Sequence, residues 1–509
     1  MTGNRKVLAY LATALLANLM AATPAHAGAD WTEMFEVSGY VESDIRYIVE
    51  NNRGATPGDG YKFELNRNDV NLRLGITPDE RVRAVVDTRL RFYGFNEAAQ
   101  LPELVSRDRI DPYSLHLDEA YLWVKGLIWD GIDLKFGRMI QNWGTADQFN
   151  PTDNLNARDL SDPLDYSAKV PNQMIELDIY PADWLTLSFV WVPVFKPSQL
   201  PASATLGFAV EYGKNGCFAR APTPPLRPED VETLGEQFML LDPCALNFVD
   251  PEVRTVNPPL KIGNSQAAAK AKFLVGDFDF SLSYYYGRFS FPVALDAVAF
   301  VDASASQPGE IDVKYIAEIM YPRMHVAGFD FSYSAEWLFD VGFVGEIAVI
   351  FPEKVTFGMR AYQGGTELPN LRFSNVNVRD EPFVKATAGF DYTFSSWLYA
   401  NFMYVRGFFD EFADMYDVHN YVVGAVELKF LEDEMKIRIG TAFNADDISA
   451  TLNPTVTWVV YPSVELIAGG LIFFGDIDPE DPYDYAKKDK FGMKAAGRSV
   501  AFLKGKVSW

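Results

Sequence analysis

A row of arginines at alternate positions is the feature of this sequence with the clearest potential for chemistry. One face of the segment 81–92 carries charge: Arg81, Arg83, Asp87, Arg89 and Arg91. The other face carries apolar side chains and one threonine: Val82, Ala84, Val86, Thr88, Leu90 and Phe92. Successive side chains of a β-strand point to opposite faces, so a strand here would gather four guanidinium groups on one side. Such a face cannot lie against lipid and must look into water or a polar interior.

An acidic segment offers the opposite charge. Residues 142–171 contain five aspartates: Asp147, Asp153, Asp159, Asp162 and Asp165. If this segment folds into a lumen lined by the arginines, the transverse electric field across the gap would orient dipolar solutes. We expect Arg81, Arg83, Arg89 and Arg91 to face Asp147, Asp153 and Asp159. The predicted constriction comprises these residues together with Arg73, Lys135 and Arg158. The alternative is that the arginines only hold the segment in place through ion pairs.

The elements that must position these residues are strands of about ten residues that alternate in polarity. Lys385 and Thr387, for example, alternate with Val384, Ala386 and Ala388. Tight connections alternate with mostly longer ones along the chain, and the strands number 18, with 311–334 taken as one of them. This pattern predicts an all-β transmembrane antiparallel barrel with short periplasmic turns, long external loops and both termini on the periplasmic side. A soluble sandwich also alternates, but its polar faces look outward.

The two ends of the chain support export to the outer membrane of a Gram-negative bacterium. Arg5 and Lys6 precede an apolar run, and Ala25-His26-Ala27 forms a small-x-small cleavage site, so residues 1–27 are predicted to be a signal peptide. A retained N-terminal anchor is the alternative. The last strand ends in Trp509, similar to the C-terminal signal by which the barrel-assembly machinery recognises its clients. The barrel is expected to occupy residues 28–509.

Composition narrows the class of function further. The formal net charge of −24 argues against nucleic acid as a partner, because its phosphates would be repelled. Cys217 and Cys244 lie in the long segment 194–265 and are expected to form a disulfide in the oxidising periplasm, with free thiols or a metal pair as the alternative. The acidic segment around Asp476 and Asp484 could hold Ca²⁺ or be a solvated surface. No catalytic motif stands out, so we expect no enzyme activity, no cofactor and no metal.

Part of the sequence resembles a known family. The relevant residues are Gly137-Arg138, Trp143-Gly144, Asp147 and Asn150-Pro151. They resemble the G-R-x-x-x-x-W-G…D…N-P signature of a porin-like outer-membrane family of unknown function from proteobacteria. The resemblance implies a monomeric or loosely associated barrel and, for some relatives, a role beside exporters of hydrophobic cargo. The segment 194–265 departs from that pattern in its length and its cysteine pair.

These observations together predict an outer-membrane, porin-like channel for passive or facilitated diffusion of small solutes. Segment 142–171 is expected to fold inward and narrow the lumen, and segment 194–265 to be a long external loop. The expected partners are outer-membrane lipid, the barrel-assembly machinery and a small-molecule solute. The alternative is an outer-membrane scaffold for an envelope-spanning transport or motility complex, with periplasmic or envelope proteins docking on 194–265.

Overall fold

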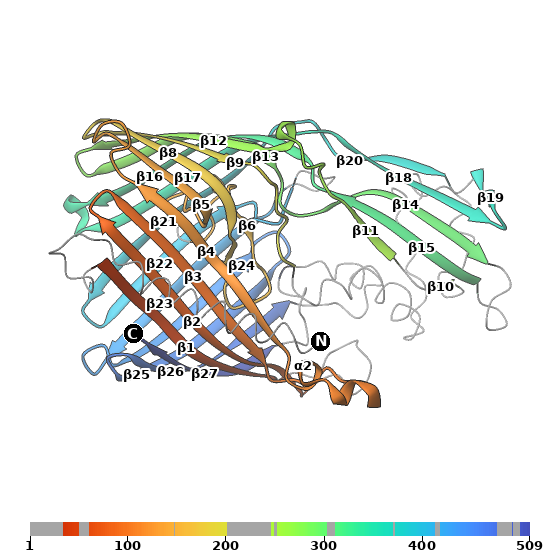
Figure 1. The fold of residues 1–509 in the computed structure, drawn as a ribbon, viewed down its shortest axis with the longest axis horizontal. Helices are drawn as coiled ribbons and strands as arrows, with labels where there is room; N and C mark the ends of the chain where they lie inside the picture. The colour runs from red at the N-terminus through yellow and green to blue at the C-terminus, as the bar shows by residue number, and fades with distance from the viewer. Residues whose placement is uncertain are drawn as a thin grey trace.

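A closed β-barrel dominates the computed structural model. The structure describes residues 34–49, 61–146, 148–200, 246–248, 252–302, 311–369, 372–412, 418–475, 491 and 499–509. In this part of the chain, 18 strands form a single antiparallel sheet in which consecutive barrel strands pair with each other. β1 also pairs with β27, from Tyr40 opposite Ser508 to Ile48 opposite Val500, and this pairing closes the cylinder (Figure 1). The predicted fold class and strand number are confirmed.

The barrel strands follow the predicted segments closely. The first nine are β1 (Phe35–Ile48), β2 (Phe63–Asp79), β3 (Val82–Tyr93), β4 (Tyr113–Val124), β5 (Ile132–Met139), β8 (Asn172–Ala182), β9 (Leu185–Val192), β12 (Gln266–Val275) and β13 (Phe278–Arg288). The second nine are β16 (Arg323–Ala335), β17 (Val341–Pro352), β21 (Phe383–Ser395), β22 (Leu398–Arg406), β23 (Asn420–Phe430), β24 (Met435–Asn444), β25 (Ser449–Tyr461), β26 (Val464–Gly475) and β27 (Val500–Ser508).

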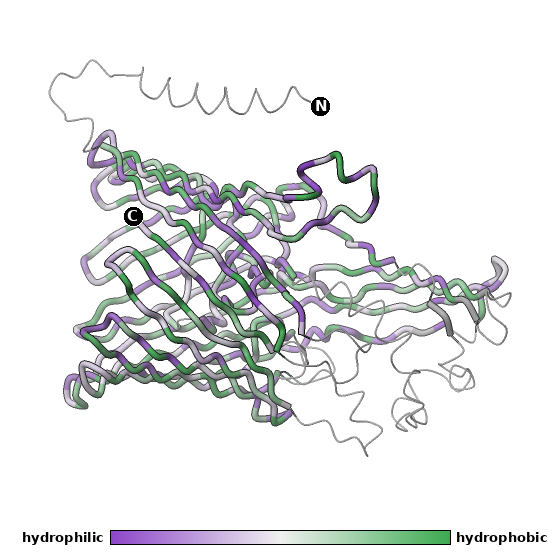
Figure 2. Tube along the Cα trace, turned by 90° about the horizontal axis from the view of Figure 1, so that it is seen from below, coloured by the Kyte–Doolittle hydropathy of each residue, from purple (hydrophilic) through white to green (hydrophobic). Residues whose placement is uncertain are grey.

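The two faces of the barrel wall differ in polarity. On β1, Val41 and Ile45 are exposed on the outer surface, whereas Asp44 and Arg46 between and beside them are buried inside. The same alternation continues on the next strand, because Asp44 lies opposite the buried Arg67 of β2 in the register of the two strands. Hydrophobic and hydrophilic residues alternate in this way along most strands (Figure 2). The cylinder therefore presents an apolar exterior and encloses a largely polar interior.

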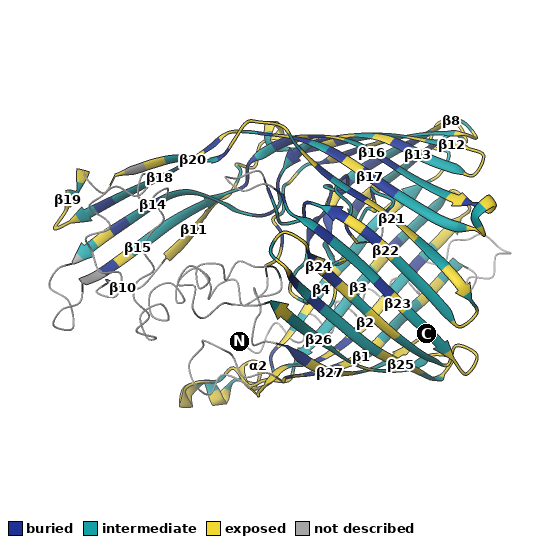
Figure 3. Ribbon diagram, turned by 180° about the vertical axis from the view of Figure 1, so that it is seen from behind, coloured by how far each residue is buried: buried dark blue, intermediate teal, exposed yellow. Residues whose placement is uncertain are grey.

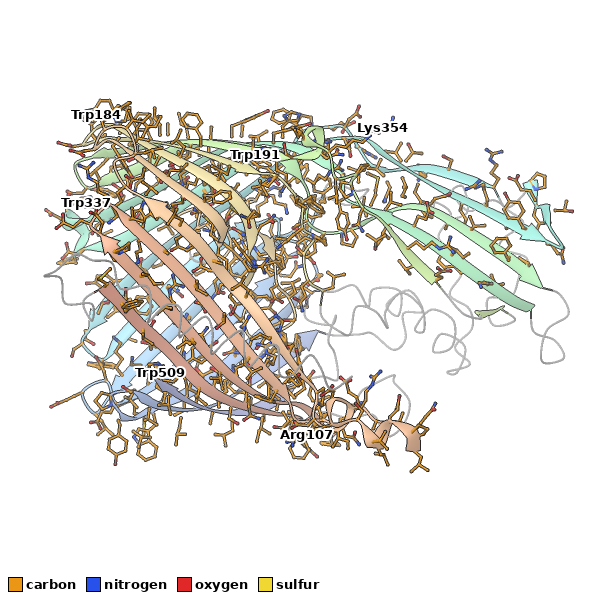
Figure 4. All side chains as sticks on the ribbon, viewed as in Figure 1. Arg107, Trp184, Trp191, Trp337, Lys354 and Trp509 are labelled. Carbon is orange, nitrogen blue, oxygen red and sulfur yellow. The ribbon has the colours of Figure 1, made fainter. Side chains whose placement is uncertain are left out.

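The two ends of the barrel also differ. Short turns join strands at one end, which carries Trp184, Trp337 and the terminal Trp509 (Figure 4). Exposed tryptophans at one level suit the interface between lipid and water. Trp123, by contrast, belongs to the interior, because its Nε1 donates to Asp133 Oδ2 at 3.2 Å. No helix in the described residues is long and apolar enough to cross a membrane.

A second sheet projects from the long-loop end of the barrel (Figure 1). We call it the arm. Its strands are β10 (Leu246–Phe248), β11 (Glu252–Val256), β14 (Val293–Asp302), β15 (Ile311–Met320), β18 (Val355–Gln363), β19 (Thr366–Glu367) and β20 (Phe373–Val378). The arm corrects one prediction, since 311–334 is two strands rather than one. Pro322 lacks the N–H that a continuous ladder needs, so β15 ends at Met320 and β16 starts at Arg323 in another sheet.

The remaining described elements are short. A 3-10 helix η2 (Leu101–Val105) and the helix α2 (Arg107–Ile110) lie between β3 and β4. Two further 3-10 turns are η6 (Ile262–Asn264) and η7 (Glu336–Leu338). The pair β6 (Ala157–Arg158) and β7 (Lys169–Val170) belongs to segment 142–171. Buried positions concentrate in the half of the barrel nearer the arm (Figure 3).

Candidate functional site

Segment 142–171 is attached to the inner wall of the barrel at β17. The carboxylate of Glu346 is buried and accepts hydrogen bonds from the backbone N–H groups of Thr145 at 2.6 Å and Ala146 at 2.7 Å. It also accepts one from Thr152 Oγ1 at 2.8 Å and one from Asn150 Nδ2 at 3.3 Å. One inward carboxylate thus receives donors from Thr145, Ala146, Asn150 and Thr152.

Several residues of the signature quoted above have a physical role in this attachment. A Cβ added to Gly144 would lie only 2.3 Å from Glu346 Oε1, so glycine lets the segment approach the carboxylate. Trp143 is buried, and its carbonyl accepts a hydrogen bond from Lys270 of β12. The Lys270 ammonium also lies 5.4 Å from the centroid of the Trp143 ring, a cation–π contact. The signature therefore fits the fixing of this segment to the wall.

The same segment is attached a second time, at β1 and β2. Arg46 holds Asp162 with two hydrogen bonds of 2.7 Å, one to each carboxylate oxygen, and Arg67 Nη2 adds a third at 3.2 Å. Burial alone would raise the pKa of Asp162. The hydrogen bonds and charge of Arg46, the hydrogen bond from the Leu164 N–H and the charge of Arg67 outweigh burial and hold this pKa well below its usual range. The attachment is charged and bidentate, the stronger kind of ion pair.

These two attachments lie on opposite sides of the barrel. In the ring of 18 described strands, β17 is the ninth strand from β2 in either direction. Between them, the Phe149 carbonyl accepts a hydrogen bond of 2.7 Å from Thr387 Oγ1 of β21. Leu164 packs against Ile48, Leu471 and Val500 of β1, β26 and β27. Segment 142–171 therefore crosses the lumen from one wall to the other.

The arginine row has other partners than the segment's aspartates. Arg83 pairs with Glu36 at 2.6 Å, Arg89 with Asp118 at 3.2 Å and Arg91 with Asp69 at 2.8 Å. We expected these arginines to face Asp147, Asp153 and Asp159; of the two aspartates that the structure describes, Asp153 pairs with Lys169 and Asp159 accepts the Ser161 N–H. The cause is register: Asp69 lies directly opposite Arg91 across β2 and β3, which puts a carboxylate within reach in the wall itself.

The predicted wall cations Arg73 and Lys135 also pair with carboxylates of the wall. Arg73 bridges Asp87 at 3.0 Å and Glu119 at 2.7 Å, and Lys135 pairs with Glu176 at 2.9 Å. Arg81 is displaced from the predicted site altogether, because it lies in the exposed turn after β2 and pairs with Asp130 at 3.0 Å. Arg73 and Arg89 remain 38% and 26% exposed although they point inward. Water therefore reaches the inner face of β2 and β3.

The predicted residues of the segment divide among several places. Asp153 forms an ion pair with Lys169 inside the segment. Asp159 accepts the Ser161 N–H at 3.0 Å, which closes a local turn. Arg158 is buried on β6 and lines a cavity next to β13, β16, β17 and β21. Asp147 lies outside the described residues, as do Cys217, Cys244, Asp476, Asp484 and the predicted signal peptide 1–27.

Sequence reasoning missed the residues that hold the segment. Glu346, Arg46 and Arg67 all occupy inward positions of predicted strands, and Asp162 was one acidic residue among five. A usable signal existed for Glu346, which follows Gly345 within an otherwise apolar strand. A carboxylate in such a place needs donors. The sequence alone does not say that a segment 200 positions away supplies them.

An apolar patch lines the inner wall from β5 to β9 and again at β16 and β17. Its buried wall residues come from β5, β8, β9, β16 and β17: Met139, Met174, Val190, Val192, Met324, Val326 and Ile350. Loop residues pack against it: Trp143, Leu155, Phe289, Phe291 and Phe412. Tyr166 of the segment packs on Phe408 and Phe409, and burial raises its pKa to about 12. The segment is thus fixed by packing on one side and by ion pairs on the other.

Comparisons with known proteins give fold-level likenesses only. No protein-family model matches the chain, and no curated protein matches it. Among solved structures, the OccAB3 protein of Acinetobacter baumannii is similar at 8% identity and a TM-score of 0.46, with 93% of this chain and 99% of that chain covered. OmpF of Salmonella typhi in complex with daunomycin is similar at 8% identity and a TM-score of 0.37, with 93% and 97% covered. At these identities and TM-scores, the likenesses support no statement about function.

Proposed function

We propose that this chain is an outer-membrane channel for passive or facilitated diffusion of small solutes, narrowed by segment 142–171. One observation carries the proposal. The segment is fixed to opposite walls of a closed barrel, yet the inward arginines of β2 and β3 stay accessible to water. An 18-stranded barrel is wide enough for an aqueous lumen, and a crossing segment restricts its cross-section.

The electrostatics of the narrowed level support selection by charge. The wall at β2 and β3 gathers Arg73, Arg89 and Arg91, each next to a carboxylate. Paired charges of both signs within a low-dielectric tube create local fields that orient polar solutes. In this proposal the field arises between neighbouring strands of one wall, with the pairs of Arg46 and Arg67 with Asp162 joining wall and segment beside it.

The arm supports a second candidate, an outer-membrane scaffold. Its strands come from three separate loops and form one sheet beyond the barrel end, where a protein partner could bind. Val253, Val256 and Phe300 are exposed on it. For a scaffold, the docking surface would be the arm. Of the arm's described strands, only β10 and β11 belong to segment 194–265, on which we expected partners to dock.

Planar lipid bilayers separate the two candidates. Purified full-length protein is added to one side of the membrane in molar salt solution, and the current is recorded at fixed voltage. A channel gives stepwise current increments that scale with salt, whereas a scaffold with a filled lumen stays silent. Silence from protein that is folded, shown by its heat-dependent mobility on a denaturing gel, would overturn the proposed function.

A further inference from the structure

A row of mostly aromatic side chains crosses the outer surface of the barrel near the arm. One register row takes a residue from each of β9, β12, β13, β16 and β17: Trp191, Ala267, Tyr286, His325 and Phe351. Trp191 and Phe351 are exposed, whereas Val190 and Ile350, the residues before them, are buried inside the barrel. The row therefore faces outward, and Trp191 lies toward the arm end (Figure 4). Amphipathic rings at one level suit the membrane–water interface.

Two arginines lie two positions beyond this row, at the end of β13 and the start of β16. Arg288 and Arg323 are opposite each other in the register of the two strands. Arg323 Nη1 donates to the Tyr286 hydroxyl at 2.7 Å, and the guanidinium carbon lies 5.3 Å from the centroid of that ring. Arg323 is thus on the outer face, next to the ring row, at the level of lipid headgroups.

The described partners of both guanidinium groups are neutral oxygens. Arg323 Nη2 donates to the Gly263 carbonyl at 2.7 Å and to Asn264 Oδ1. Arg288 Nη1 donates to the Tyr321 carbonyl at 2.5 Å, and its Nη2 lies 3.4 Å from the same Asn264 Oδ1. The buried Nε of Arg288 has no hydrogen-bond partner among the residues that the structure describes. Two like charges converge on one amide oxygen, and a bound anion would offset their repulsion.

One carboxylate lies close to this pair of arginines. Glu353 Oε1 accepts the backbone N–H of Arg323 at 2.7 Å, and its charge acts on Arg288. It forms no ion pair with either guanidinium in the described part of the chain. The segments that meet here are 257–265, 286–289, 321–325 and 351–354, and their charged residues are Lys261, Arg288, Arg323, Lys354 and Glu353. Positive charge therefore outweighs negative charge in these segments, and Lys354 lies where the barrel meets the arm (Figure 4).

Two large apolar side chains are exposed beside these cations. Leu260 is 86% exposed and Ile262 is 84% exposed, on either side of the exposed Lys261. Asn264 Nδ2 donates to the Pro259 carbonyl at 2.8 Å and orders the turn that carries them. Apolar side chains next to Lys or Arg are typical of segments that lie at the boundary between headgroups and acyl chains. This neighbourhood favours a lipid over a soluble anion.

A cavity of about 380 Å³ adjoins the arginine pair. Apart from three prolines, its described lining residues are Val194, Phe195, Asn257, Leu260, Lys261 and Asn264. None of these is acidic, and Asn264 is the residue that both arginines contact. The volume lies in the range of ligand sites in proteins. The cavity offers room for the polar part of a lipid headgroup beside the cations.

From these features we infer that the outer surface at the arm ends of β13 and β16 binds the phosphate group of a phosphorylated lipid. Arg288, Arg323 and Lys261 would hold the phosphate, and Leu260 and Ile262 would contact acyl chains. A phosphate monoester carries a charge of about −1.5 to −2 and three acceptor oxygens, which suits several converging donors. The inference rests on the membrane location contained in the proposed function, and it does not depend on conduction.

Native mass spectrometry of the full-length protein released from detergent micelles tests the inference. The protein is titrated with diphosphoryl lipid A, with the same lipid after removal of both phosphates, and with inorganic phosphate. We expect the phosphorylated lipid to be retained at a concentration at least tenfold lower than either of the others, because it alone offers both charge and acyl chains. Equal retention of the two lipids would overturn the inference, and so would inorganic phosphate that binds as tightly as the phosphorylated lipid.

Two variants test the assignment of the phosphate site. Arg323→Gln should bind diphosphoryl lipid A roughly tenfold more weakly, since a charge-assisted hydrogen bond is lost. Lys261→Gln alters an exposed side chain outside the barrel strands and should weaken binding severalfold. Arg107→Gln is the matched control, because it removes one charge at the same end of the barrel, far from Lys354, and should bind as the unaltered protein does (Figure 4).

Unchanged affinity in both Arg323→Gln and Lys261→Gln, with heat-dependent gel mobility showing folded barrels, would contradict the assignment. The outcome is separable from that of the proposed function. Stepwise bilayer currents from a protein that does not retain the phosphorylated lipid would overturn this inference alone. Phosphate-dependent lipid binding by a folded protein that gives no currents would overturn the channel alone.

Discussion

The inner wall at β1 and β2 and the inner wall at β17 hold the same segment by different physics. At β1 and β2 two arginines clamp Asp162, and the surroundings are polar. At β17 a single carboxylate, Glu346, receives backbone and side-chain donors, and its cross-strand neighbours are Asp330 and Thr387. If Asp162 is lost, Arg46 still has Asp44 as an ion-pair partner. If Glu346 is lost, the backbone N–H groups that it binds have no other acceptor among the described residues. The β17 attachment should therefore be the less replaceable of the two.

Breaking the β17 attachment should have the largest effect. Glu346→Leu leaves the Thr145 and Ala146 N–H groups buried without an acceptor, at a cost of about 1–3 kcal/mol for each group. We expect the segment to detach from this wall and the single-channel conductance to rise severalfold in planar bilayers. Glu36→Leu is the control, because Glu36 is 68% exposed and pairs only with Arg83 among the described residues. An unchanged conductance in Glu346→Leu would mean that packing and the Asp162 ion pairs hold the segment without Glu346.

Breaking the opposite attachment should have a smaller effect. Asp162→Asn removes the charge that Arg46 and Arg67 share, but both arginines keep Asp44. We expect mean conductance within about twofold of the unaltered channel and more frequent current fluctuations, as the segment loosens at one end. Asp165→Asn provides the comparison, since Asp165 only caps its own turn at Ser167. A larger conductance change in Asp162→Asn than in Glu346→Leu would reverse the ranking of the two walls.

Charge reversal tests what the arginine row does. Arg89→Glu combined with Arg91→Glu puts negative charge on a water-accessible wall, so the reversal potential in a salt gradient should shift toward cation preference. The shift should exceed that of Arg81→Glu, which lies in a turn. If ion preference does not move, the row only braces neighbouring strands.

Mild acid should have the smallest effect. The pKa of Asp162 in the folded protein lies below its value of about 3.9 in the unfolded chain. The ion pair of Asp162 therefore stabilises the fold above a pH of about 3.9, and this stabilisation is lost only as the pH falls through the lower, folded-state pKa. Conductance at pH 4.5 should match that at pH 7 once bulk conductivity is corrected. A transition between these values that is absent from Asp162→Asn would show that Asp162 is not held as an ion pair.

The fold was predictable because its signals are local. Alternation in segments such as 435–444 and tight turns such as Ser395-Ser396 fix strands and connectivity from neighbouring residues alone. The arm was not predictable, because its strands pair across three loops and only Tyr321 and Pro322 separate β15 from β16. The structure has Arg83, Arg89 and Arg91 on β3 and Arg81 in a turn, and the partners of these arginines depend on register between strands. The Glu346 attachment joins residues about 200 positions apart, which no local pattern reports.

The central claim is that segment 142–171 sets the narrowest point of an aqueous barrel. Its most direct test is exclusion of polyethylene glycols of increasing size from the open channel in planar bilayers. The unaltered protein is compared with a variant in which residues 144–165 are replaced by a short Gly-Ser linker. We predict that larger polymers enter the shortened channel than enter the unaltered one. The same size cut-off in both proteins would contradict the account.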